Sequence, residues 1–204
     1  SCFQHWKETT STSPSGRHLG HYWALDAVDG CPIDSDDPVH TFGNIMWEIH
    51  TIMLNIAITT GYAMERWCKV INCLLEKDPG SPKITRLRVI HLYEADYNLI
   101  LKVLWARRLV HHADKCKILG TQNSGSRPGH GCMDVVLMKE MSYTLSRMLH
   151  MPLGTFDNDA KSCYDRIIPS VAMLASRRAG MPKEACQMHV SMLKRARYHI
   201  KTKL

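Results

Sequence analysis

The chain has 204 residues, of which 45% are hydrophobic and 22% charged, so it is long enough to bury the core of one domain or of two small ones. Its longest apolar stretch, residues 45–64, is interrupted by polar residues and falls short of the roughly 20 apolar residues that a membrane span needs. The sequence does not open with a secretory leader pattern, and its eight cysteines form no Cys-x-x-Cys pair. We therefore expect a globular, intracellular protein with reduced thiols and no membrane partner.

Positive charge is concentrated in the C-terminal part. Residues 1–165 carry 17 Lys and Arg against 18 Asp and Glu, a net charge of −1, whereas residues 166–204 carry 9 against 1, a net charge of +8. A polyanion partner would explain this bias, because cations that neutralise phosphates release counterions. A solvated basic helix face explains it equally well.

The first half of the chain alternates between loop and regular patterns. Residues 9–20 and 26–40 are rich in turn-forming residues and predict loops. A helix that packs against the core and stops at Gly61 is predicted next, because apolar side chains recur at spacings of three and four; they are Ile45, Ile49, Ile52, Met53 and Ile56.

A β-hairpin and two further helices are predicted after this helix. Residues 70–75 and 87–92 are apolar and strand-like, and the charged segment between them contains a Pro-Gly turn. Apolar periodicity then predicts helices over residues 92–112 and 134–149.

The segment with the clearest chemical signal is residues 155–165, Thr-Phe-Asp-Asn-Asp-Ala-Lys-Ser-Cys-Tyr-Asp. Its three carboxylates stand between apolar neighbours, although Asp is depleted in strands and costly to bury unpaired. Mg²⁺ takes oxygen ligands and typically binds one or two carboxylates together with substrate phosphates. The segment is therefore a candidate Mg²⁺ site for nucleotide chemistry.

Residues 159–165 resemble the first palm motif of group II intron and non-LTR retrotransposon reverse transcriptases, in which a catalytic Asp is followed five residues later by Phe or Tyr and then by Asp. The register selects Asp159, because an Asp157 ligand would place Ser162 at the aromatic position. For Asp165 a structural role as a cap or loop anchor comes first.

The resemblance implies a role for each matched residue. Asp159 would be catalytic and would bind Mg²⁺ or Mn²⁺, with the carbonyl of Ala160 as a second contact. The backbone amides of Ser162 and Cys163 would lie near the incoming triphosphate. The ring of Tyr164 would exclude a 2′-hydroxyl and so select deoxynucleotides.

A second motif lies upstream, where residues 122–134 resemble the Gln-x-Gly-Phe-Arg-Pro-Gly-Arg-Ser block that leads into a fingers helix of the same enzymes. A glycine-bracketed loop that opens a helix offers free N–H groups to a phosphate. Arg127 is accordingly a possible phosphate or template contact, and the alternative is an ordinary loop with a surface arginine.

The third motif is residues 87–92, which resemble the Arg-Pro-Ile-Ser-Leu fingers motif with Val89 in place of Pro. The resemblance implies that Arg88 contacts the incoming triphosphate, a task that suits a permanently charged guanidinium. Lys77 resembles the fingers lysine that shares this work, although Lys83 and Arg86 are alternatives.

The three motifs occur in the order of the family. They imply a helix-rich α/β fold, a partial right-hand polymerase with an N-terminal helical extension of the fingers (1–66), the fingers (67–150) and a partial palm with the first catalytic motif (151–204). After that motif, residues 169–180 and 183–196 are expected to be helices and residues 198–204 a strand.

The implied function is that of a fragment of an RNA-directed DNA polymerase from a retroelement, with an RNA template, a DNA primer and dNTPs as partners, and a nuclear location fits this family. Two-metal nucleotidyl transfer needs carboxylates from separate strands, and the family's Tyr-x-Asp-Asp hairpin does not occur in these residues. We therefore expect the fragment to be inactive alone. The alternatives are a non-catalytic nucleic-acid-binding remnant of such a polymerase and a helical scaffold protein.

Overall fold

The structure is a computed structural model of the chain and describes residues 14–16, 38–80, 83–125, 127, 129–159 and 166–201. The chain divides into two compact units, one comprising Ser1–Leu101 with Pro182–Leu204 and the other Lys102–Met181. The fold is mixed α/β and rich in helix, with one small sheet. The domain boundaries expected at residues 66 and 150 stay predictions.

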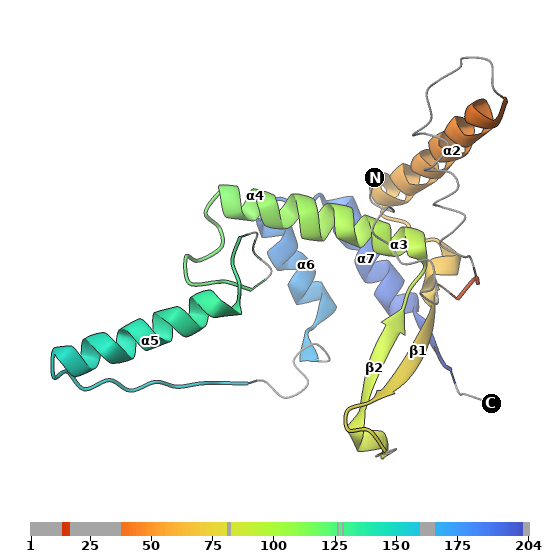
Figure 1. Cartoon of the computed structure of the whole chain (residues 1–204). Coiled ribbons are helices and arrows are strands. Elements are labelled where there is room, and N and C mark those ends of the chain that lie inside the picture. Colours follow the sequence, from red (N-terminus) through yellow and green to blue (C-terminus); the bar gives the residue numbers. More distant parts are fainter. Residues whose placement is uncertain are drawn as a thin grey trace. The chain divides into compact units, whose positions relative to one another are not determined.

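A three-stranded sheet in the order β2-β1-β3 lies in the first unit (Figure 1). β1 (Lys69–Glu76) follows the short 3₁₀ helix η1 (Glu65–Cys68) and pairs antiparallel with β2 (Leu87–Leu92), which follows η2 (Ile84–Arg86). β3 (Arg197–Ile200) lies parallel to β1 on its other side. The predicted hairpin is confirmed. A C-terminal strand is confirmed too, but it ends at Ile200, and residues 202–204 of the predicted strand lie outside the described residues.

The helix predicted before Gly61 is confirmed as α2 (Pro38–Thr60), but the prediction of its buried side was wrong. The apolar side chains chosen from the sequence are exposed, whereas Leu54 and Ala57, on another side of the helix, are buried. The exposed ones are Ile45, Ile49, Ile52, Met53 and Ile56.

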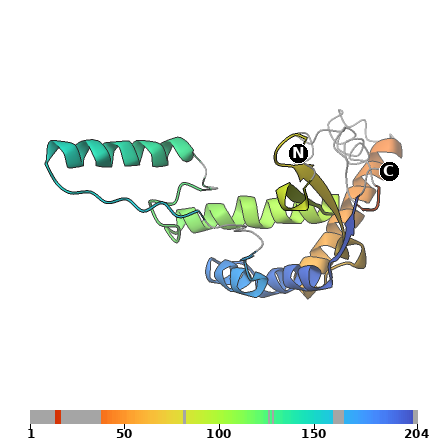
Figure 2. The same cartoon turned by 90° about the horizontal axis from the view of Figure 1, so that it is seen from below.

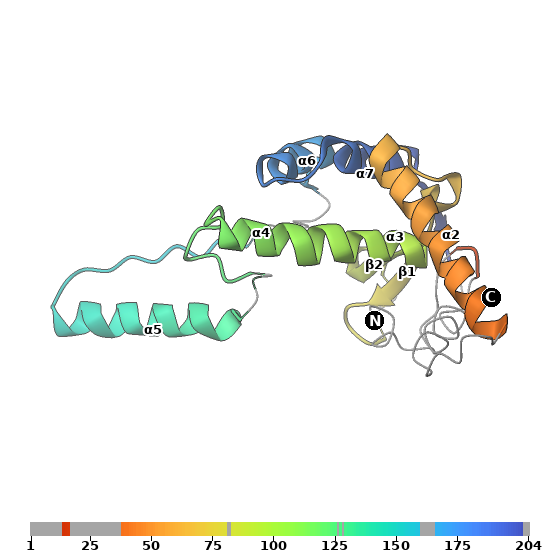
Figure 3. The same cartoon turned by 90° about the horizontal axis from the view of Figure 1, so that it is seen from above.

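The side of α2 that is buried is the one that packs against α7 (Lys183–Arg195). The two helices cross in Figures 2 and 3. Gly61 has a φ of +73°, and a Cβ on it would lie 3.3 Å from the carbonyl oxygen of Glu184 and from the side chain of Gln187. Small residues at Ala57 and Gly61 let the two helices approach, so side-chain size, and not only hydrophobicity, selects the contact.

The helix expected over residues 92–112 runs from α3 (Ala95–Ile100) through a π-helical segment, η3 (Leu101–Leu109), into α4 (Val110–Lys115). Its existence is confirmed, but Leu92 belongs to β2. The π-helical turns were not predicted. They are rare, and a period-3.6 pattern does not reveal them.

The core of the first unit forms where α3 and α7 meet the start of the sheet. Its largest side chains, with no exposed surface, are Trp67, Val70, Tyr97, Met188 and Met192. The outer parts of the sheet carry exposed apolar residues, among them Leu75 and Ile90. The sheet is therefore anchored at one end.

The second unit contains α5 (Cys132–Met148) and α6 (Pro169–Arg178), which confirm the other predicted helices, as α7 does in the first unit. Trp105 donates its indole N–H to the Ser176 hydroxyl at 3.3 Å, which links η3 to α6. Within the described ranges, no helix is long and apolar enough to cross a membrane.

Candidate functional site

The hairpin holds two predicted nucleotide-binding cations close together in the ladder. Arg88 lies directly opposite Leu75 in the register of β1 and β2, and the Lys77 amide donates to the Arg86 carbonyl at 2.9 Å just beyond the end of β1. Lys77 is therefore placed opposite Arg86, two residues along the other chain segment from Arg88. Both side chains are exposed.

The alternatives to Lys77 lie at the tip of the same hairpin. Arg86 donates from Nη1 to Asp78 Oδ2 at 2.6 Å, so its charge already has a partner. In the part of the chain that the structure describes, no ion pair involves Lys77, Lys83 or Arg88. The contacts thus favour Lys77 over Arg86, while its role in nucleotide binding stays a prediction.

Arg127 is not a surface arginine. Its Nε lies 2.6 Å from Asp114 Oδ1, and only 16% of its side chain is exposed. The Gly120 carbonyl lies 3.5 Å from Nη1, a long contact. Arg127 therefore ties the loop before α5 to the end of α4, which favours a structural role. Contact with a phosphate or a template stays a prediction.

Asp159, the candidate catalytic carboxylate, stands at the end of an extended segment, residues 151–159, which runs beside α5 toward its N-terminal end (Figures 1 and 3). The Asp159 side chain is exposed. Near the start of the segment, Ser146 Oγ donates to the Met151 carbonyl at 2.5 Å, and the Met151 amide donates to the Ser146 carbonyl at 3.0 Å.

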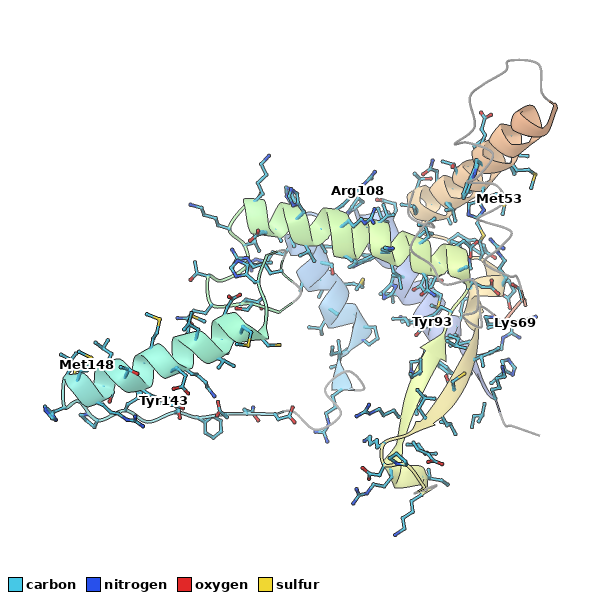
Figure 4. All side chains as sticks on the ribbon, viewed as in Figure 1. Met53, Lys69, Tyr93, Arg108, Tyr143 and Met148 are labelled. Atoms are coloured by element: carbon cyan, nitrogen blue, oxygen red, sulfur yellow. The ribbon has the colours of Figure 1, made fainter. Side chains whose placement is uncertain are left out.

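Two further side-chain contacts join residues 151–159 to α5. The hydroxyls of Tyr143 and Thr155 lie 3.2 Å apart, and Lys139 Nζ lies 2.5 Å from Asp157 Oδ1. Figure 4 shows Tyr143 on the side of α5 that the segment follows. The Asp157 hydrogen bond raises the pKa of Lys139. Asp157 thus has a cationic partner, whereas no described residue forms an ion pair with Asp159.

The other palm residues of the predicted site, Ala160, Ser162, Cys163 and Tyr164, lie outside the described residues, as does Asp165. Among the residues that are described, no group of three or more His, Cys, Asp or Glu side chains is placed to hold a metal ion. A two-metal centre would thus need carboxylates in addition to Asp159.

Sequence reasoning missed a buried polar network behind the hairpin. Asp96, with no exposed surface, accepts hydrogen bonds from the Trp67 indole N–H and the Tyr97 amide, both at 3.0 Å, and pairs with Arg66. This network fixes the junction between β2 and α3. An Asp in the first turn of a predicted helix was the available signal.

A second carboxylate at this junction is also buried. Glu94, only 1% exposed, accepts hydrogen bonds from the Ser15 amide and hydroxyl, both at 2.9 Å. Ser15 belongs to a segment that is distant in sequence, so Glu94 fastens this segment to the start of α3.

Part of the C-terminal positive charge is used within the fold. Glu65 pairs with both Arg195 and Arg197, and Arg195 also donates to the Ala63 carbonyl at 3.0 Å. Arg177, Arg178, Lys183 and Lys194 are exposed and, unlike Arg195 and Arg197, form no ion pair with another described residue. Only a subset of the basic residues is therefore displayed to a polyanion.

A scan against models of protein families gives no match for this chain, and a search of curated proteins gives none either.

Proposed function

We propose that the chain comprises the fingers and the first part of the palm of a reverse transcriptase, with the three domains and the right-hand polymerase fold that the motifs imply. The observation that supports this most is the proximity of Lys77 and Arg88 in an antiparallel hairpin, where Lys77 lies opposite Arg86 and Arg88 opposite Leu75. The order of elements also supports the proposal. A helical stretch from α3 to α4 follows the hairpin, then come a loop, α5, the extended segment that carries Asp159, two further helices and a strand.

The chemistry proposed for the hairpin is the binding of a triphosphate. The planar guanidinium of Arg88 can donate two hydrogen bonds to phosphate oxygens, and the ammonium of Lys77 adds a compact positive charge. Both cations are exposed and lie near the same end of the hairpin, so one ligand could contact the two. Tyr164 is the proposed selector of the deoxyribose.

The chemistry proposed for Asp159 is metal binding. A divalent ion there, Mg²⁺ or Mn²⁺, would neutralise phosphate charge and activate the primer 3′-hydroxyl when further carboxylates complete the centre. Asp159 is exposed, and the neighbouring Asp157 is bound to Lys139. Both carboxylates are exposed, but Asp159 is the one that has no ion pair with a described residue, and the Ala160 carbonyl is its proposed second contact.

The chain alone is expected not to polymerise, because one carboxylate cannot hold the two ions of nucleotidyl transfer. Primer extension on a poly(A) template with Mg²⁺ or Mn²⁺ checks this expectation. Template-dependent synthesis that disappears in Asp159→Ala would contradict it and would show that these residues suffice for catalysis.

The proposed function is tested by the binding of a deoxynucleoside triphosphate with and without Mn²⁺. We expect Mn²⁺ to strengthen binding to the unaltered chain and to have no such effect on Asp159→Ala. Glu140→Gln is the matched control, because it removes an exposed carboxylate of α5. If Asp159→Ala keeps the full response to Mn²⁺, the assignment of Asp159 fails.

The second candidate is a nucleic-acid-binding remnant without chemistry, and the exposed cations near the ends of α6 and α7 favour it. Such a remnant would bind RNA in a salt-dependent way but would show no Mn²⁺-dependent triphosphate binding. Translation of the gene beyond Leu204 also separates the two, because an intact Tyr-x-Asp-Asp motif supports the enzyme and an early stop supports the remnant.

A further inference from the structure

The segment that carries Asp159 is attached to α5 by polar contacts. Lys139, Tyr143 and Ser146 recur at spacings of four and three, so they share one side of the helix. The apolar side chains of the segment are largely exposed; they are Met151, Leu153 and Phe156. Apolar packing therefore contributes little to holding the segment in place.

Two of these contacts, Lys139–Asp157 and Tyr143–Thr155, have matching spacings along the helix and the segment. From Tyr143 back to Lys139 the helix rises by about 6 Å, and from Thr155 to Asp157 an extended chain advances by roughly 6.6 Å. Two residues of the segment thus correspond to one helical turn, which lets both contacts form together.

The ion pair between Lys139 and Asp157 is the contact nearest to Asp159, which lies two residues further along the segment. In an extended chain a slip of one residue turns every side chain to the opposite side. A contact that holds Asp157 therefore also sets the direction in which Asp159 projects.

We propose that Lys139 is a positioning residue that sets the register of residues 151–159 by binding Asp157, and that it thereby directs Asp159 and removes Asp157 from competition for the metal. The first part rests on the contacts of Lys139, Tyr143 and Ser146. The second part rests on the proposed function, because it concerns the metal that Asp159 binds.

Register is measured by NMR on the whole chain, through the nuclear Overhauser contact between the Tyr143 ring and the Thr155 methyl group. Lys139→Met removes the charge and keeps an unbranched side chain only one atom shorter, whereas Lys139→Arg keeps the charge. Exposed ion pairs contribute modestly, so we expect Lys139→Met to weaken the contact about two- to fivefold and Lys139→Arg to preserve it.

Exchange of the two charges provides the rescue. Lys139→Asp combined with Asp157→Lys should restore the Tyr143–Thr155 contact, which Lys139→Asp alone abolishes. Asp157→Asn tests the same ion pair from the segment and should resemble Lys139→Met. An unchanged contact in both Lys139→Met and Asp157→Asn, or a failed rescue, would overturn the proposal.

A second measurement separates this proposal from the proposed function. Paramagnetic broadening by Mn²⁺ should centre on Asp159 in the unaltered chain and spread to Asp157 in Lys139→Met. Broadening that stays centred on Asp159 in every variant supports metal binding but overturns the positioning role. Loss of the Tyr143–Thr155 contact without broadening at Asp159 in any variant supports the positioning role and overturns the proposed metal site.

Discussion

The ring of Tyr97 lies nearly parallel to that of His189, at an interplanar angle of 11° with centroids 6.0 Å apart, and its hydroxyl is 2.5 Å from His189 Nδ1. Burial raises the pKa of Tyr97 and lowers that of His189 to about 4. A neutral imidazole can accept the Tyr97 hydroxyl hydrogen at Nδ1, whereas a protonated one cannot. The hydrogen bond from the Tyr97 hydroxyl to His189 Nδ1 therefore requires both side chains to be uncharged.

This pair predicts that acid destabilises the first unit. Between the ordinary histidine pKa of 6.5 and the folded value of about 4, only the unfolded chain takes up a proton at residue 189. The free energy of unfolding contributed by His189 is complete above pH 6.5 and is lost as the pH falls to about 4. The full effect is on the order of 3 kcal/mol.

Urea unfolding at a series of pH values measures this dependence, and His189→Gln supplies the comparison. Other groups titrate in both proteins, so the difference between the two curves isolates His189. We expect the curve of the unaltered chain to fall more steeply between pH 6.5 and 4. Parallel curves would show that His189 is not buried in its neutral form.

Asp96 and Asp78 provide a contrast between a buried and an exposed ion pair. Asp96→Ala leaves the Trp67 indole N–H without its acceptor and Arg66 without its carboxylate, so a loss of about 3 kcal/mol of unfolding free energy is expected. Asp78→Ala removes the exposed partner of Arg86 and should cost less than about 1 kcal/mol. Equal losses in urea denaturation would contradict the burial of the Asp96 network.

Gly61 and Gly80 test the contact between α2 and α7. Both have positive φ, +73° and +81°, so an alanine at either position is strained by about 1 kcal/mol or more. Only at Gly61 would the new Cβ also press on Glu184 and Gln187. Gly61→Ala should therefore lower the urea midpoint clearly more than Gly80→Ala, and equal midpoints would show that α7 does not approach α2 closely.

Local sequence patterns predicted most helices and strands, because turn residues and apolar periodicity act over a few neighbouring residues. The Pro-Gly turn between two apolar stretches specified the hairpin, and periodic apolar residues specified α2 and α5. Which side of α2 is buried depends on residues more than 120 positions away, such as Glu184 and Gln187. No local pattern contains that information.

The motifs singled out the candidate residues from the sequence, but they did not show which of these residues form ion pairs in the fold. Arg88 and Lys77 lie near each other because the predicted hairpin pairs the two strands that precede and follow the turn, whereas the pairing of Arg127 with Asp114 and of Lys139 with Asp157 is tertiary. Charge alone could not show which arginines already have partners.

The hairpin gives the sharpest test of the proposed nucleotide site, because it offers two arginines of different status. Arg88 is exposed and has no ion pair with a described residue, whereas Arg86 is bound to Asp78. We expect Arg88→Ala to weaken binding of a deoxynucleoside triphosphate by about tenfold, the effect of losing one charge-assisted hydrogen bond. Arg88→Lys should recover part of the loss, because it restores the charge without the second donor.

Arg86→Ala is the control for this titration, since it removes an arginine from the same hairpin and should leave the affinity within about twofold of the unaltered chain. Tenfold weakening by both variants would indicate general electrostatic attraction to the hairpin tip. Weakening by Arg86→Ala alone would move the triphosphate contact to the tip and would remove the support that Arg88 lends to the reverse transcriptase assignment.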